Sequence, residues 1–186
     1  MDNSQIIIQI SDFIKKYKNF KNVKLYAKIG KYSQFGFEEG IFSGENYDKI
    51  LNLLNSCQTW ENKEVFFTEK YTEKSSKILD SLTIKYKNTP YDFIITAESI
   101  TKEQIFISEF YKNKIDKYKK KQHYFIVSKC KDDRFIGQEN YNFVLELIPK
   151  DNVKDVYTSE STFLKIKDII NCCEKISEDS LLEKIN

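Results

Sequence analysis

From residue 65 to residue 148 the chain consists almost entirely of segments with the composition of β-strands. β-Branched and aromatic residues are frequent throughout, and turn-forming residues interrupt the region at Asn88-Thr89-Pro90, Asp132-Asp133 and Gly137. So many strands without intervening helices favour an antiparallel sheet that closes, or nearly closes, into a barrel. We expect the strands at residues 65–72, 77–87, 91–97, 104–111, 119–128 and 142–148.

One more strand precedes this region, at residues 23–29. Its side chains alternate between an apolar set (Val23, Leu25, Ala27 and Ile29) and a polar set (Lys24, Tyr26 and Lys28). Because successive side chains of a strand point to opposite faces, this strand has one face for a core and one polar face.

Three segments have apolar residues at helical spacing. They are 6–17, with Asn3 or Ser4 as N-cap, 45–54, with Ser43 or Gly44 as N-cap, and 161–176. Trp60 is expected to pack near the end of the middle helix, and a short turn is expected after Ser177. Together these elements predict an α+β fold of mostly antiparallel β structure, a barrel packed by N-terminal, middle and C-terminal helices. Residues 1–186 are expected to form a single domain.

Composition narrows the function classes. The chain has 186 residues, 15% of them aromatic, with only 5 Gly and 2 Pro, which excludes disordered, collagen-like and glycine-loop designs. A net charge of +2 gives no overall attraction to nucleic acid. Arg134 is the single arginine, so phosphate contacts would depend on lysines.

The cysteines and the N-terminal residues indicate the cellular compartment in which the protein is expected. The four cysteines, two of them adjacent, form no C-x-x-C pattern, which is typical of free thiols in a reducing compartment. The start Met1-Asp2-Asn3-Ser4 lacks the basic residues of a signal peptide, and the apolar run 6–8 is too short to cross a membrane. A soluble cytoplasmic protein without a membrane partner is expected.

Few residues carry recognisable chemistry. The single histidine, His123, is close to no nucleophile motif, and the tract 112–121 holds six lysines that suit either a solvated edge or a phosphate chain. Lys119, Lys121 and His123 would share one face of a strand. Glu146 would share its face with Val144, where it either contributes to a metal site or pairs with a lysine such as Lys24 or Lys28.

Residues 23–30, Val-Lys-Leu-Tyr-Ala-Lys-Ile-Gly, resemble the first signature strand of the metal-dependent RNA 5′-triphosphatases of fungi, protozoa and large DNA viruses. Further segments are similar to that family in the same order. They are Gly40-Ile41, a helix at 47–54 with Trp60, then 92–98, 119–124 and 142–147, followed by a C-terminal helix. The similarity covers nearly the whole chain and lies in the order of the motifs.

The resemblance implies an eight-stranded tunnel that holds an RNA triphosphate, with glutamates binding Mn²⁺ or Mg²⁺ and basic side chains binding phosphate. By this resemblance, the candidates for phosphate binding are Lys24, Lys28, Lys119 and Lys121. The candidates for metal binding are Glu146 and Glu98, and Glu146 is also the candidate catalytic residue. The residues expected to line the lumen are Tyr26, His123 and Val144.

The chain departs from the family at most of the metal ligands. Lys24 and Tyr26 stand at the two glutamate positions of the first strand, and Val144 stands at one of those in the closing strand. A lysine at a ligand position places a positive charge where the metal cation would bind. Two such unit charges ~4 Å apart repel by ~4 kcal/mol at an effective dielectric near 20. No cofactor is therefore expected, or Mn²⁺ or Mg²⁺ if the chain is an active enzyme.

Three functions stay open. The first is a catalytically inactive, triphosphatase-like protein of viral or lower-eukaryote mRNA capping or transcription, a non-catalytic subunit that binds protein partners or an RNA 5′ end. The second is an active RNA 5′-triphosphatase, a polynucleotide 5′-phosphatase that removes the γ-phosphate of nascent mRNA. The third is an unrelated barrel that binds proteins through exposed aromatics, namely Tyr32, Phe35, Phe37 and Phe42.

Overall fold

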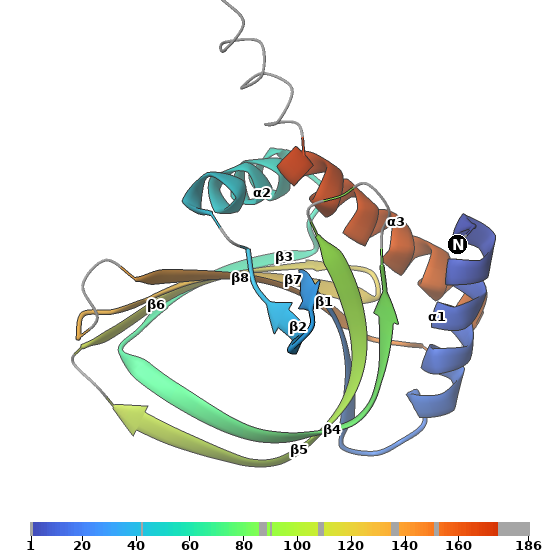
Figure 1. Ribbon diagram of the computed structural model, residues 1–186, viewed down its shortest axis with the longest axis horizontal. Coiled ribbons are helices and arrows are strands. Elements are labelled where there is room, and N and C mark those ends of the chain that lie inside the picture. The colour runs from blue at the N-terminus through green and yellow to red at the C-terminus, as the bar shows by residue number, and fades with distance from the viewer. Residues whose placement is uncertain are drawn as a thin grey trace, which may run out of the picture.

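The computed structural model describes residues 2–41, 43–85, 89, 91–107, 110–134, 138–150 and 153–174. Helices cover one side of a single curved antiparallel sheet (Figure 1), which confirms the expected α+β class. The elements in chain order are α1 (Asn3–Tyr17), β1 (Val23–Ser33), β2 (Gly36–Glu39), α2 (Gly44–Ser56), β3 (Asn62–Thr68), β4 (Lys70–Ile84), β5 (Asp92–Ile107), β6 (Tyr111–Lys120), β7 (His123–Asp132), β8 (Glu139–Leu147) and α3 (Asp155–Glu174).

The sheet has eight strands in the order β3-β6-β7-β8-β1-β5-β4, and β2 pairs with β1 outside this path. It curls strongly enough to give the tunnel-like outline seen end-on in Figure 1, with the three helices outside the curve. We call the side of the sheet that the helices cover the outer face and the opposite side the inner face.

The sheet is tunnel-like but is not closed into a true barrel, because its two edge strands, β3 and β4, are not paired in the described part of the chain. Glu69 alone joins them. Antiparallel partners need at least a two-residue hairpin loop between them, so β3 and β4 cannot pair directly across this connection.

The core lies between the outer face and the helices. Leu25, Ala27 and Ile29 of β1 are all at most 2% exposed, as the alternation along this strand predicts. Ile10 of α1 and Ile166 of α3 are fully buried in the same cluster. The expected stripe of α3 is confirmed, since Phe163, Ile166, Ile169, Ile170 and Cys173 are all buried.

The middle helix is fixed at both ends. The Ser43 hydroxyl accepts a hydrogen bond of 3.1 Å from the Asn46 amide, which confirms Ser43 as N-cap. Past the C-terminus, the Trp60 indole donates to the Leu54 carbonyl at 2.7 Å, and its ring packs 5.2 Å from that of Tyr118. The first helix instead has Asp2 as its N-cap, so the expectation of Asn3 or Ser4 was wrong by one or two positions.

Three strand predictions are wrong. The segment 65–72 is not one strand, because β3 ends at Thr68 and β4 begins at Lys70. The segment 104–111 is not a separate strand, because β5 runs through to Ile107 and β6 begins at Tyr111. The segment 119–128 contains a hairpin: Lys121 has a φ of 55°, and the chain turns at Lys121-Gln122 between β6 and β7. The turn expected after Ser177 lies outside the described residues, as does Phe42.

This hairpin places His123 on the outer face. It pairs with Leu147 across β7 and β8, is 1% exposed, and its Nε2 lies 2.9 Å from the Thr162 hydroxyl of α3. Thr162 itself donates to the Thr158 carbonyl, so Nε2 carries the proton and donates. The expectation that His123 lines the tunnel, on one face with Lys119 and Lys121, was therefore wrong.

Among the described helices, none combines the length and the apolar character that crossing a membrane requires.

The buried imidazole makes a testable contribution to acid sensitivity. Burial, with a smaller effect from Lys165, lowers the pKa of His123 to about 3. Below its ordinary pKa of about 6.5 the unfolded chain binds a proton that the folded chain excludes, so stability falls as the pH falls. Between about pH 7 and about pH 5, wild type should lose roughly 2 kcal/mol more unfolding free energy than His123→Gln, measured by urea titration. Equal pH dependence of the two proteins would contradict this placement of His123.

Candidate functional site

The inner face of the sheet collects the polar side chains of β1. Lys24, Tyr26 and Lys28 alternate with the buried apolar residues of this strand and therefore point away from the helices. Register with β8 places Tyr26 opposite Glu146 and Lys28 opposite Val144. Residues from β1 and β8 that the sequence singled out thus lie on one surface.

Lys24 and Glu146 form the first ion pair of this surface. The Lys24 ammonium lies 3.0 Å from Glu146 Oε1, and the lysine side chain is 45% exposed while the glutamate side chain is 13% exposed. Glu146 thus has a protein cation beside its carboxylate. Of the alternatives open for this residue, pairing with a lysine is the one that the structure shows.

Lys28 lies between two carboxylates from different strands. Its ammonium is 2.8 Å from Glu98 Oε1 of β5 and 3.2 Å from Glu39 Oε2 of β2. The Thr96 hydroxyl donates a further hydrogen bond of 2.8 Å to Glu98. The cluster is well shielded, because only 18% of the Lys28 side chain and 8% of the Glu98 side chain are exposed.

Glycine at position 30 is what brings β2, and with it Glu39, against β1. A Cβ at this position would lie 2.1 Å from the Glu38 carbonyl oxygen, inside any allowed contact. The register pairs Gly30 with Glu39 directly. The backbone approach thus supplies one of the two carboxylates that surround Lys28.

The electrostatics of the cluster favour its charged form. Burial alone would raise the pKa of Glu98, but hydrogen bonds and the charge of Lys28 outweigh it and hold this pKa below its ordinary value. Burial would lower the pKa of Lys28, but Glu39 and Glu98 hold it above its ordinary value. The stabilisation that ionised Glu98 gives is present above the ordinary carboxyl pKa and is lost as the pH falls through the folded-state pKa.

The remaining candidates lie at different places. Lys119 of β6 pairs with Tyr124 of β7, which pairs with Glu146, so Lys119 lies in the row of inner-face residues that includes Glu146. It forms a 3.6 Å ion pair with Glu61. Lys121 lies in the β6–β7 turn, where its amide donates to Glu61 Oε1 at 2.8 Å, and not within a strand beside Lys119 as expected.

Sequence reasoning missed Glu39, Thr96, Lys117 and Tyr124 of this surface. Tyr124 and Lys117 follow from the β6–β7 register, and the Lys117 ammonium lies 4.0 Å from the centre of the Tyr124 ring. Thr96 is two residues from Glu98 and alternates with Phe93, Ile95 and Ala97, which was a usable signal. Glu39 has no such signal, because only the approach of β2 brings it to Lys28.

The residues present do not fit the Mn²⁺ or Mg²⁺ site that the resemblance implies. Such ions need several carboxylate oxygens that converge on one point. In the described ranges no three histidine, cysteine, aspartate or glutamate side chains come together in this way. Glu146 and Glu98 are each paired with a lysine instead, so an entering cation would meet the ammonium groups of Lys24 and Lys28.

Comparisons with known proteins agree on fold. The structure of the S. pombe Pct1 RNA triphosphatase matches with a TM-score of 0.56 over 99% of this chain and 92% of that chain, at 10% sequence identity. The same enzyme in complex with the Spt5 CTD matches with a TM-score of 0.55 over 99% and 93% of the two chains, also at 10% identity. Neither a protein-family model nor a curated protein matches the sequence.

Fold and surface define a curved, tunnel-like sheet, similar in fold to the Pct1 RNA triphosphatase, on whose inner face Glu146 and Glu98 are each paired with a lysine. The likeness to Pct1 is one of fold.

The two lysines of β1 differ in burial, which gives a matched test. Lys28→Met leaves Glu98 buried without its cation and should cost about 3 kcal/mol of unfolding free energy. Lys24→Met removes an equal charge from a pair whose lysine is 45% exposed and should cost less than about 1 kcal/mol. Adding Glu98→Gln to Lys28→Met should recover part of the loss. Urea unfolding of the four proteins measures this, and equal costs for the two single variants would refute the burial argument.

Proposed function

We propose that this chain is a triphosphatase-like tunnel protein that does not hydrolyse triphosphates and acts as a non-catalytic subunit or partner in viral or lower-eukaryote mRNA capping or transcription. It acts as one domain spanning residues 1–186, in the cytoplasm. The observation that carries the proposal is the pair of ion pairs on the inner face, Lys24–Glu146 and Lys28–Glu98.

Metal-assisted hydrolysis of a triphosphate needs a cation that neutralises charge on the phosphates as water attacks. Here the carboxylates that would hold such a cation are neutralised by covalently attached ammonium groups. A like charge ~4 Å from an entering cation costs ~4 kcal/mol at an effective dielectric near 20, before the shortage of ligand oxygens is counted. These terms oppose metal binding and support the non-hydrolytic reading over the active one.

A role through protein contacts is supported by two observations. The S. pombe Pct1 enzyme has the same fold and has been solved in complex with a protein segment, the Spt5 CTD. The β1–β2 hairpin of this chain carries Phe35, which is 91% exposed, at its tip. Tyr32 of the same hairpin is also exposed, at 47%, and two exposed aromatic side chains near one hairpin tip are suited to a partner surface.

Hydrolysis is tested directly with γ-labelled triphosphate RNA in the presence of Mn²⁺ or Mg²⁺. Wild type should release no phosphate above the protein-free blank. Release that Glu146→Ala abolishes would overturn the proposal and restore the active enzyme. Glu45→Ala is the control, because Glu45 is a 64% exposed glutamate on α2 whose loss should leave any genuine activity intact.

The partner role is tested by affinity capture from the source cells, followed by mass spectrometry. We expect a capping-enzyme or RNA polymerase subunit to be recovered with wild type and lost with Phe35→Ser. Phe20→Ser is the matched control, because Phe20 is also an exposed phenylalanine, at 57%, but lies between α1 and β1. Recovery that is unaffected by Phe35→Ser would remove the hairpin from the proposed interface.

A further inference from the structure

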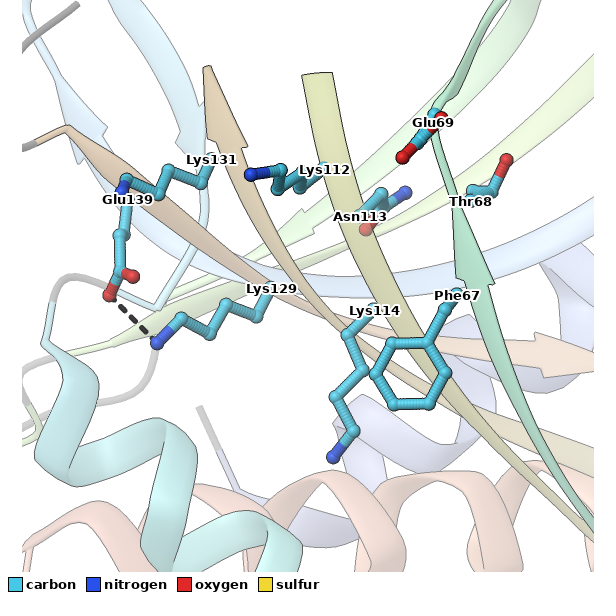
Figure 2. Close-up of a pocket in the computed structure, with 9 residues that line it drawn as sticks. All are labelled: Phe67, Thr68, Glu69, Lys112, Asn113, Lys114, Lys129, Lys131 and Glu139. Carbon is cyan, nitrogen blue, oxygen red and sulfur yellow. Dashed lines mark ion pairs between the residues drawn. The ribbon is translucent and has the colours of Figure 1, made fainter. Parts of the chain in front are cut away.

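A second cluster of cations lies on the outer face, where β3, β6, β7 and β8 extend past the helices. Figure 2 shows lysine side chains from β6 and β7 around a pocket of about 640 Å³. We call it the lysine pocket. The residues that matter for its chemistry are Phe67, Lys112, Lys114, Lys129, Lys131 and Glu139.

The strand register places like charges directly opposite each other in this pocket. Lys112 pairs with Lys131, and Lys114 pairs with Lys129, in successive positions of the same face of the β6–β7 ladder. Like charges at opposed positions destabilise a sheet. The four ammonium groups have three carboxylate partners: Asp133 is shared by Lys112 and Lys131, Asp116 lies 3.0 Å from Lys114, and Glu139 lies 2.9 Å from Lys129.

The ion pairs at the outer end of the pocket are exchangeable. Asp133 is shared between Lys112, at 3.2 Å, and Lys131, at 3.1 Å. The two lysine side chains are 62% and 47% exposed. Because exposed ion pairs contribute little free energy, a phosphate oxygen can replace Asp133 at small cost.

Aromatic rings flank the lysines. One row of the sheet runs Phe67, Lys114, Lys129, Tyr141 across β3, β6, β7 and β8. Phe67 is 78% exposed, although it is a large apolar side chain next to charged ones. At the other end of the row, Lys129 lies 5.6 Å from the centre of the Tyr141 ring. An exposed ring beside a track of cations is the arrangement that binds single-stranded nucleic acids, because bases stack while phosphates meet the cations.

We propose that the lysine pocket binds a single-stranded nucleic acid, with its lysines on the phosphates and Phe67 stacked on a base. An acidic peptide would use the lysines equally well, but it would give the exposed Phe67 ring no stacking partner. The site lies on the outer face, away from the inner-face residues, and does not depend on the proposed function.

Fluorescence anisotropy with a labelled RNA of about ten nucleotides and a 5′-hydroxyl end tests this on the full chain. Between about 50 and 200 mM salt, log affinity should fall against log salt with a slope of about −3, since each neutralised phosphate contributes about −0.7. Phe67→Ala should weaken binding roughly 5- to 100-fold. The Lys112→Gln/Lys131→Gln double variant should reduce the slope to about half.

The chain provides matched controls for each variant. Phe66→Ala removes the adjacent ring, which points to the inner face, and should leave affinity unchanged. Lys15→Gln/Lys21→Gln removes two exposed lysines that lie outside the pocket, in α1 and just after it, and should leave the slope unchanged. All altered residues are at least partly exposed, and circular dichroism checks the fold of each variant.

Three results would overturn the proposal. One is the absence of saturable RNA binding at about 50 mM salt. Another is equal loss of affinity on changing Phe66 and Phe67, or a greater effect of the Lys15→Gln/Lys21→Gln variant than of the pocket variant. The last is displacement of the RNA by an oligo-glutamate peptide as effectively as by unlabelled RNA, which would assign the pocket to acidic peptides.

Discussion

The packing of one face of the sheet against α1 and α3 is the constraint on which the rest of the structure depends. Leu25, Ala27 and Ile29 are each at most 2% exposed, and burying a Leu or Ile side chain contributes about 1.5–3 kcal/mol. A register slip of one residue would turn this apolar set outward and place Lys24, Tyr26 and Lys28 against the helices. The core therefore determines which side chains lie on the inner face.

Once Lys28 is held on a shielded surface, its charge needs partners. The ammonium of a lysine side chain that is only 18% exposed cannot depend on water alone, and β2 and β5 supply carboxylates at 3.2 and 2.8 Å. In a metal centre, a free cation neutralises such carboxylates and exchanges with solvent. Here the cation is attached to β1 and cannot leave, so the same carboxylates contribute to stability and are not available as ligands.

Local pattern was enough to predict the alternation of β1, the cap at Ser43 and the apolar stripe of α3, because each depends on neighbours within a few residues. The pairing of Lys28 with Glu98 and Glu39 was beyond such reasoning, since three strands distant in sequence must meet. Lys121 shows a different limit. Its φ of 55° is unusual for a residue with a side chain, and Lys-Gln carries none of the turn signals that Gly or Asn give. The alternation was therefore extended through the turn, and His123 was assigned to the wrong face.

The lysine-rich tract shows how the same alternation separates two surfaces. In β6, Lys112 and Lys114 point to the outer face beside Phe67, whereas Lys117 and Lys119 point to the inner face beside Tyr124. The net charge of +2 for the chain gives no indication of either lysine cluster, because a ligand responds to the local electrostatic field and not to the total charge. Exposed charges that are farther apart than the Debye length, about 8 Å at physiological ionic strength, are largely screened from each other, and this applies to lysines that extend from opposite faces of a sheet. Charge bound at one face is thus largely screened from the other, so what an anion meets at the outer lysines depends on their own partners, Asp116, Asp133 and Glu139, and not on the inner-face glutamates.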